Sequence, residues 1–163
     1  MPYTKAMRIL SFDPGYERLG VAVLEREQGK EQLLHSDCVQ TSKDLSFYER
    51  LTDIGNATES IINKWKPDAV ALEDLYFNTN QKTAMKVAAV RGVVAFLAKR
   101  SGLPVFEYTP AQVKVAVTGY GKSSKEQMMT MVPKLVSIQK EIRFDDEYDA
   151  IAVGLTCLAC ERL

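Results

Sequence analysis

The sequence predicts an α/β fold whose core is a five-stranded mixed sheet, three antiparallel strands followed by two parallel strands, flanked by helices. The first part of the chain contains three short apolar runs separated only by tight turns, which is typical of an antiparallel meander. Beyond residue 45, apolar residues at helical spacing alternate with two more short apolar runs, which is typical of parallel strands joined through helices. Because the chain has 163 residues and no repeat or Gly/Ser-rich linker, we expect a single domain, residues 1–163.

Three strands are expected before residue 41. The first, 8–13, is an apolar run that ends at a Pro-Gly turn, and a Gln-Gly-Lys turn separates the second, 20–27, from the third, 31–40. From residue 45 the apolar residues recur at helical spacing, and Pro67 prevents that helix from continuing. The antiparallel part of the sheet is therefore followed by one amphipathic helix.

The next three elements alternate strand, helix and strand. Residues 69–73 (AVALE) predict a buried strand, 81–100 a long helix and 104–108 the fifth strand. This order places the fourth and fifth strands parallel to one another, with the long helix crossing between them.

Helix-capping patterns define the last three helices. Thr109-Pro110-Ala111-Gln112 is a capping box with proline at the first helical position, so a helix should begin at Pro110. Ser123 and Ser124, each followed three residues later by Glu or Gln, predict the start of another helix, which we expect Pro133 to end or kink. A final helix is expected from residue 145 or 146 to about residue 160.

Basic and acidic residues are equal in number, 21 of each, but they are unevenly distributed. Between Tyr76 and Lys140 there are ten Lys or Arg residues and two acidic residues, a net charge of +8, so the remainder carries −8. A basic segment beside an acidic one is typical of a protein in which one surface meets a polyanion while carboxylates hold cations. Ordinary solvated helix faces would produce the same pattern.

Cysteine content and hydropathy indicate the compartment. The chain has three cysteines, an odd number, contains no apolar run near the roughly 18 residues of a membrane span, and begins MPYTKAMRIL without an apolar signal segment. We expect a cytoplasmic protein with reduced thiols and no membrane association.

Two carboxylates lie at the ends of apolar strands, Asp13 after RILSF and Glu73 after AVAL, where α/β sheets usually place their ligand sites. Asp146 and Asp149 are spaced i and i+3 at a helix start, so both project from one face. Each pair has a simpler interpretation, as a turn residue and a solvent-facing strand end or as helix-capping acids. If the four converge, they form an all-oxygen site suited to Mg²⁺ or Mn²⁺.

Two such ions would activate water and stabilise the leaving oxygen of a phosphodiester. The only histidine, His35, precedes all but the first of these acids and lies on the third strand, which argues against Ser-His-Asp and Cys-His mechanisms. His35 with Cys38, and Cys157 with Cys160, leave open a Cys₃His zinc site if these segments meet, although buried apolar cysteines are the simpler interpretation.

Four segments of the chain resemble the RuvC family of Holliday-junction resolvases, in the family's order and spacing. These are RILSFDPGYERLG (8–20), ALEDLYFNTNQKTAMKVAAVRG (71–92), LPVFEYTPAQVKVAVTGYGKSSK (103–125) and DEYDAIAVGLT (146–156). The resemblance implies an RNase H-like fold, a homodimer and a Mg²⁺-dependent endonuclease that makes paired symmetric nicks across a four-way DNA junction during recombination and repair. It also suggests RuvA and RuvB branch-migration proteins as partners.

The resemblance assigns roles to individual residues. The catalytic, metal-binding acids fall on Asp13, Glu73, Asp146 and Asp149, and two basic residues near the scissile phosphate fall on Lys114 and Lys125. Tyr76 aligns with an aromatic residue that stacks on an unpaired base, and the expected DNA contacts are Tyr76, Phe77, Asn80, Lys82, Thr83, Lys86 and Lys122. For the lysines, solvated helix faces are the alternative, and for the two aromatic residues, core packing.

Three positions depart from the family pattern: Thr79 replaces a lysine, Cys157 stands where many members have histidine, and Pro133 interrupts a helix. All four acids are present. The alternatives left open are an RNase H-like nuclease acting on RNA or flaps, a nucleotide-binding kinase or ATPase of the actin-like class suggested by the Asp-Pro-Gly turn, and a module that binds junctions without cleaving them.

Overall fold

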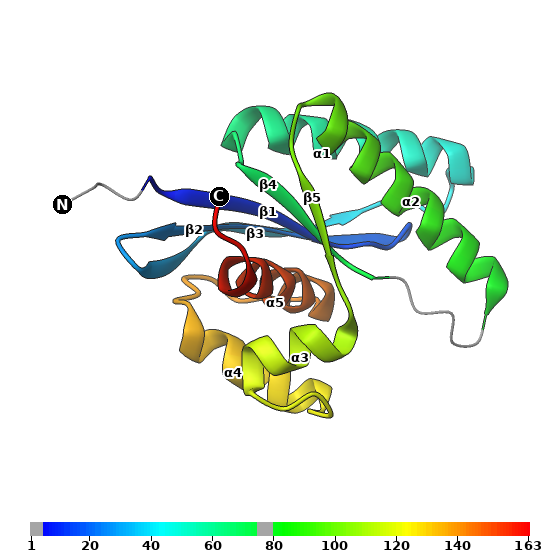
Figure 1. Cartoon of the computed structure of the whole chain (residues 1–163). Helices are drawn as coiled ribbons and strands as arrows, with labels where there is room; N and C mark the ends of the chain where they lie inside the picture. Colours follow the sequence, from blue (N-terminus) through cyan, green and yellow to red (C-terminus); the bar gives the residue numbers. More distant parts are fainter. Residues whose placement is uncertain (1–4, 75–79) are drawn as a thin grey trace.

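The structure, a computed structural model, describes residues 5–74 and 80–163. Its centre is a five-stranded sheet in the order β3-β2-β1-β4-β5 (Figure 1). The strands are β1 (Met7–Asp13), β2 (Arg18–Glu27), β3 (Lys30–Gln40), β4 (Ala69–Glu73) and β5 (Val105–Tyr108). β2 pairs antiparallel with β1 and β3, whereas β4 pairs parallel with β1 and β5, which confirms the predicted mixed sheet.

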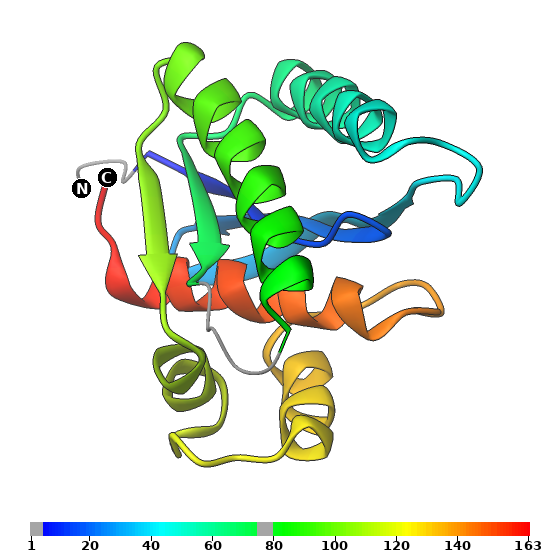
Figure 2. The ribbon, with the colours of Figure 1, turned by 90° about the vertical axis from the view of Figure 1, so that its right-hand side faces the viewer.

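Helices cover both faces of this sheet, as the views in Figures 1 and 2 agree. α1 (Phe47–Trp65) and α2 (Gln81–Arg100) lie on one face, and α5 (Asp145–Cys160) crosses the other. α3 (Pro110–Thr118) and α4 (Lys125–Leu135) pack on the outer side of α5, away from the sheet. The arrangement is an RNase H-like fold with an additional helical layer at the carboxyl end of β5.

Alternation along the central strands divides the apolar core into two layers. Ile9 on β1 and Leu24 on β2 pack with α5, whereas Leu10 and Val23 pack with α1 and α2. All four side chains are fully buried. Apolar side chains thus cover both faces of the sheet, and the carboxylates predicted to act in a functional site, Asp13 and Glu73, lie at strand ends.

The capping boxes predicted at Thr109 and Ser124 are both present, and their hydroxyls accept hydrogen bonds from the backbone N–H groups of Gln112 and Gln127. Ser123, the other candidate cap, is instead buried. Of the two effects expected of Pro133, an end or a kink of the helix, the end does not occur at the proline, because α4 continues two residues beyond it to Leu135. A proline near a helix end removes only one internal hydrogen bond, and the packing of Val132 against α5 offsets that loss.

The other boundaries agree with the sequence predictions to within two residues. Within residues 5–74 and 80–163, we find no helix that is both long and apolar enough to cross a membrane.

Candidate active site

The four predicted acids lie at one edge of the sheet. Asp13 ends β1 and Glu73 ends β4, and because these strands are adjacent and parallel, their carboxyl ends meet at the same edge. Asp146 and Asp149 lie in the first turns of α5, which crosses beneath this edge. The sheet and one helix therefore bring together residues that are more than 130 positions apart in the chain.

Gly20 on β2 allows α5 to approach closely. A Cβ atom at this position would lie 1.9 Å from the backbone oxygen of Asp146 and 3.2 Å from the Cβ atom of Asp13. Only a glycine leaves room for this contact between a strand and the start of a helix. The sequence analysis did not identify Gly20 as part of the site, although an isolated glycine within a strand is a recognised indication of close backbone approach.

The acids are electrostatically coupled. Burial raises the pKa of Asp13 well above its ordinary value, and the charges of Asp149, Glu73 and Asp146 raise it further. The pKa of Glu73 is raised by burial and then by Asp149. Burial also raises the pKa of Asp149, although Lys125 opposes this effect. The carboxylates are therefore close together and poorly solvated, so a bound cation would stabilise their ionised forms.

Two cationic side chains partly neutralise this charge. Lys125 donates a hydrogen bond from Nζ to Asp149 Oδ2 at 2.8 Å and lies 3.7 Å from Asp145. Partial burial alone would lower the pKa of Lys125, but the bond to Asp149 and its charge outweigh burial and raise it. Arg18 Nε lies 3.0 Å from Asp146 Oδ2, a pairing that the sequence analysis did not anticipate.

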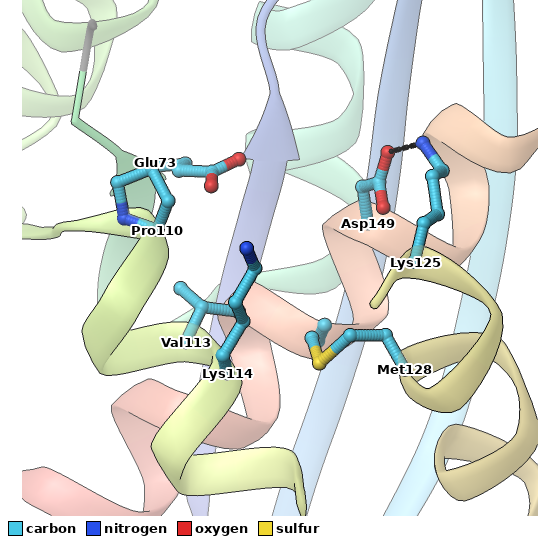
Figure 3. Close-up of a pocket in the computed structure, with 8 residues that line it drawn as sticks. Glu73, Pro110, Val113, Lys114, Lys125, Met128 and Asp149 are labelled. Atoms are coloured by element: carbon cyan, nitrogen blue, oxygen red, sulfur yellow. Dashed lines mark hydrogen bonds and ion pairs between the residues drawn. The ribbon is translucent and has the colours of Figure 1, made fainter. Parts of the chain in front are cut away.

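A cavity of about 300 Å³ opens beside the acids. Figure 3 shows Glu73 on one side and the Asp149–Lys125 pair on the other, with the Lys114 ammonium pointing into the space between them. Lys114 is close enough for its charge to lower the pKa of Glu73, against the larger effect of burial. Lys114 comes from α3 and Lys125 from α4, so both predicted lysines line one cavity with two of the four predicted acids, Glu73 and Asp149.

The donor set suits a hard divalent cation, because every candidate ligand is a carboxylate oxygen. Within the described part of the chain, no three His, Cys, Asp or Glu side chains are yet arranged closely enough to hold a metal ion. Two of the candidate ligands are paired with cations instead, Asp146 with Arg18 and Asp149 with Lys125. The residues therefore fit a divalent metal in the chemistry of their donor atoms.

Five of the seven predicted DNA contacts belong to the part of the chain that the structure describes. Tyr76 and Phe77 fall outside the described residues. Asn80 is the N-cap of α2, where its side-chain oxygen accepts hydrogen bonds from the backbone N–H groups of Lys82 and Thr83. The side chains of Lys82 and Thr83 are exposed at the start of α2, so both remain candidates for phosphate contacts.

Lys86 and Lys122 have different environments. The Lys86 ammonium lies 4.9 Å from the centre of the Tyr16 ring and 5.5 Å from that of Phe47, so aromatic rings already contact it. Lys122 is exposed in the connection between α3 and α4. No observation tests either residue as a DNA contact, and both stay predictions.

The alternative zinc site is not formed. His35 stacks on Trp65 of α1 with ring centroids 5.5 Å apart, whereas Cys157 is buried on the α5 side of the sheet. Burial raises the pKa of Cys38 and of Cys157 to about 11, which disfavours the thiolate form that binds zinc. Accordingly, no metal-binding cluster that includes these residues is present in 5–74 and 80–163.

Arg91 of α2 is a further residue that sequence reasoning missed. Its guanidinium lies 2.5 Å from Glu107 of β5 and 3.7 Å from Asp74, the residue after Glu73. It therefore ties α2 to the ends of β4 and β5 beside the site. Its place within a basic segment gave no indication of this role.

The comparisons with known proteins agree with this site. The family model described as "Crossover junction endodeoxyribonuclease RuvC" matches residues 9–157. A protein of that name from Thermosipho melanesiensis is 42% identical over 155 residues, covering 95% of this chain and 98% of its own length. Another, from Ruminiclostridium cellulolyticum, is 40% identical over 91% of this chain and 90% of its own.

Solved structures give the same assignment. Thermus thermophilus RuvC in complex with Holliday junction substrate superposes with a TM-score of 0.87 at 33% identity, covering 93% of each chain. The yeast mitochondrial Holliday junction resolvase Ydc2 shares the fold, with a TM-score of 0.68 at 14% identity over 92% of this chain and 77% of its own. The matched residues contain all four site acids and both site lysines, and the chain belongs to the crossover junction endodeoxyribonuclease RuvC family.

Proposed function

We propose that this protein is a structure-specific endonuclease that resolves four-way (Holliday) DNA junctions by paired symmetric nicks during homologous recombination and repair. The observation that carries the proposal is the convergence of Asp13, Glu73 and Asp149 in one charge-coupled site at the edge of the sheet. The similarity to a RuvC bound to Holliday junction substrate supports the choice of DNA substrate.

The proposed cofactor is Mg²⁺, with Mn²⁺ as a substitute and two ions per active site, held by Asp13, Glu73, Asp146 and Asp149. When bound, such ions lower the pKa of a water molecule and stabilise the leaving oxygen of the phosphodiester. The chain contributes a carboxylate set whose raised pKa values favour association with added positive charge. Arg18 and Lys125 each occupy only the Oδ2 atom of Asp146 and Asp149, which leaves the Oδ1 atoms as candidate metal ligands.

Lys114 and Lys125 have a second proposed role beside the scissile phosphate. Their ammonium groups line the cavity between α3, α4 and the acids. There they would offset the charge of the DNA backbone and stabilise the charge that develops on the phosphate oxygens during cleavage.

Junction binding is proposed to involve the residues that follow Glu73. Tyr76 would stack on an unpaired base, a contact worth about 1–3 kcal/mol, and Phe77 would lie beside it. Asn80, Lys82, Thr83, Lys86 and Lys122 would contact phosphates around the same edge. The net charge of +8 between Tyr76 and Lys140 supports this assignment.

We also propose a homodimer that pairs through α1 and α2, since paired nicks require two active sites. Met85 and Phe96 on α2 are 71% and 61% exposed, and Phe96 borders a groove of about 630 Å³ between the two helices. Phe96→Glu should dissociate the dimer in sedimentation experiments and leave the monomer folded. Sedimentation of Phe96→Glu as a dimer would contradict this interface.

Two further proposals rest on the family alone. These are a cytoplasmic location, where chromosomal DNA is accessible, and association with the RuvA and RuvB branch-migration proteins.

Substrate preference tests the proposed function. The purified protein, with Mg²⁺, is offered labelled four-way junction, linear duplex, flap and RNA–DNA hybrid at equal concentration. We expect symmetric paired nicks in the junction and little cleavage of the others. Equal cleavage of all four would indicate a general RNase H-like nuclease, and junction binding without cleavage under any divalent metal would indicate a binding module.

A further inference from the structure

The two site lysines belong to α3 and α4, which pack on α5 rather than on a face of the sheet. Val113 and Val117 of α3, and Met128 and Val132 of α4, pack into the apolar layer formed with α5. Figure 1 shows both helices beneath α5, on the side away from the strands. This packing holds both helices against α5 through contacts that are individually non-directional.

Two hydroxyl groups, of Thr118 and Ser123, join the end of α3 to the start of α4. We refer to this pair as the hydroxyl clamp. Thr118 Oγ1 donates to the backbone oxygen of Lys114 at 2.8 Å, and the two hydroxyls are hydrogen-bonded to one another. Between them they also hold Tyr120, whose N–H donates to Thr118 Oγ1 and whose carbonyl oxygen lies 2.5 Å from Ser123 Oγ. Ser123 is only 3% exposed, so its hydroxyl is largely shielded from water.

The clamp links the backbone of Lys114 to the backbone just before Lys125. Thr118 donates its one hydroxyl proton to the Lys114 carbonyl, and Ser123 donates its own either to Thr118 Oγ1 or to the Tyr120 carbonyl. In the first case the hydrogen bonds run from Ser123 through Thr118 to the backbone of Lys114, and in the second they run through Tyr120, whose N–H donates to Thr118 Oγ1. Ser123 precedes Ser124, the N-cap of α4, whose first residue is Lys125. Each end of the path is therefore within two residues of a site lysine.

We infer that Thr118 and Ser123 are positioning residues that set where the ammonium groups of Lys114 and Lys125 stand relative to Glu73 and Asp149. The clamp supplies the directional contact that the apolar packing of α3 and α4 lacks. This inference rests on the proposed function for its effect on cleavage, but not for its effect on lysine geometry.

Single-turnover cleavage of a four-way junction tests the inference. For Thr118→Val and Ser123→Ala we expect rates about 10- to 100-fold below wild type, because small misplacements of catalytic groups have effects of this size. Junction affinity measured in EDTA should change by less than about threefold, under 1 kcal/mol. Thr118→Ser, which keeps the hydroxyl, should restore most of the rate.

Thr130→Ala is the matched control. Its hydroxyl also donates to a backbone oxygen one turn earlier in α4, that of Glu126, but it joins no second helix. We expect this variant to cleave as wild type does. A loss of rate equal to that of Ser123→Ala would overturn the inference.

Combination with lysine variants separates positioning from stability. In a Lys125→Met background, Ser123→Ala should slow cleavage much less than it does in wild type, because one target of the clamp is already absent. An undiminished effect would mean that the clamp acts on the fold in general, against the inference.

A measurement without DNA keeps the inference distinct from the proposed function. In NMR spectra, the ¹⁵N signal of the Lys125 ammonium should be protected from exchange by its bond to Asp149 in wild type and lose that protection in Ser123→Ala. If wild type cleaves no junction, the proposed function fails while this comparison still decides the inference. Equal protection in both proteins would overturn it.

Discussion

Replacement of Gly20 by alanine tests how the fold assembles the active site. The new Cβ atom would lie 1.9 Å from the Asp146 backbone oxygen, whereas ordinary contact begins near 3.4 Å, so the start of α5 must move by about 1.5 Å relative to β2. Overpacking of this kind costs about 1–3 kcal/mol, which for a protein of this size lowers the melting temperature by about 2–12 °C. The movement also separates Asp146 from Asp13, and we expect junction cleavage to fall about 100-fold.

Thermal unfolding and single-turnover cleavage of the same Gly20→Ala preparation provide the assay. Gly55→Ala is the matched control for melting temperature, because its added methyl group would meet only the ends of Val93, at 3.4 Å, and Leu97, at 4.0 Å. Its cleavage is not compared, since Gly55 lines the groove between α1 and α2 that is proposed as the dimer interface. That variant should match or slightly exceed wild type in melting temperature, since alanine favours a helix interior. A Gly20→Ala protein with wild-type melting temperature and cleavage rate would refute the close approach of α5 to β2 as a requirement of the site.

Two further substitutions test the electrostatics. Burial and neighbouring carboxylates hold the pKa of Asp13 in the folded protein above its unfolded value, so its protonated form adds stability at low pH that is lost as the pH rises through the folded pKa. Metal-free Asp13→Asn should therefore melt above wild type at pH 8, with a difference that shrinks towards about pH 4, the ordinary carboxylate range; a lower melting temperature at pH 8 would contradict the assignment. Lys140 donates to the Ser36 backbone oxygen and pairs at 2.5 Å with Glu147, whose side chain is 5% exposed, but Lys140 itself is half exposed, so Lys140→Met should destabilise the protein by about 1–2 kcal/mol in urea unfolding. Adding Glu147→Gln should recover much of the loss, and failure of that rescue would argue against the ion pair.

Most of the sheet and the identity of the site acids could be predicted from local sequence. Asp13 and Glu73 each follow an apolar strand, and strand polarity brings the ends of parallel neighbours to one edge. The capping boxes at Thr109 and Ser124 depend only on residues three positions apart, and both formed as expected.

Features that depend on long-range packing could not be predicted in this way. The bond between Arg18 and Asp146 exists only because α5 crosses β2 at Gly20, a contact across more than 120 residues. The extent of α4 past Pro133 is decided by packing against α5 rather than by helix propensity. The zinc hypothesis failed for the same kind of reason, since the sheet separates His35 from Cys157.

Cleavage by Glu73→Gln is the most direct test of the claim that this carboxylate site performs metal-dependent junction cleavage. Wild type and variant are compared on a labelled four-way junction with Mg²⁺ and with EDTA, and junction binding is measured separately in EDTA. We expect paired symmetric nicks from wild type only with Mg²⁺, and no cleavage by Glu73→Gln despite binding close to that of wild type. Metal-independent nicking, or a Glu73→Gln protein that cleaves at the wild-type rate, would contradict the account.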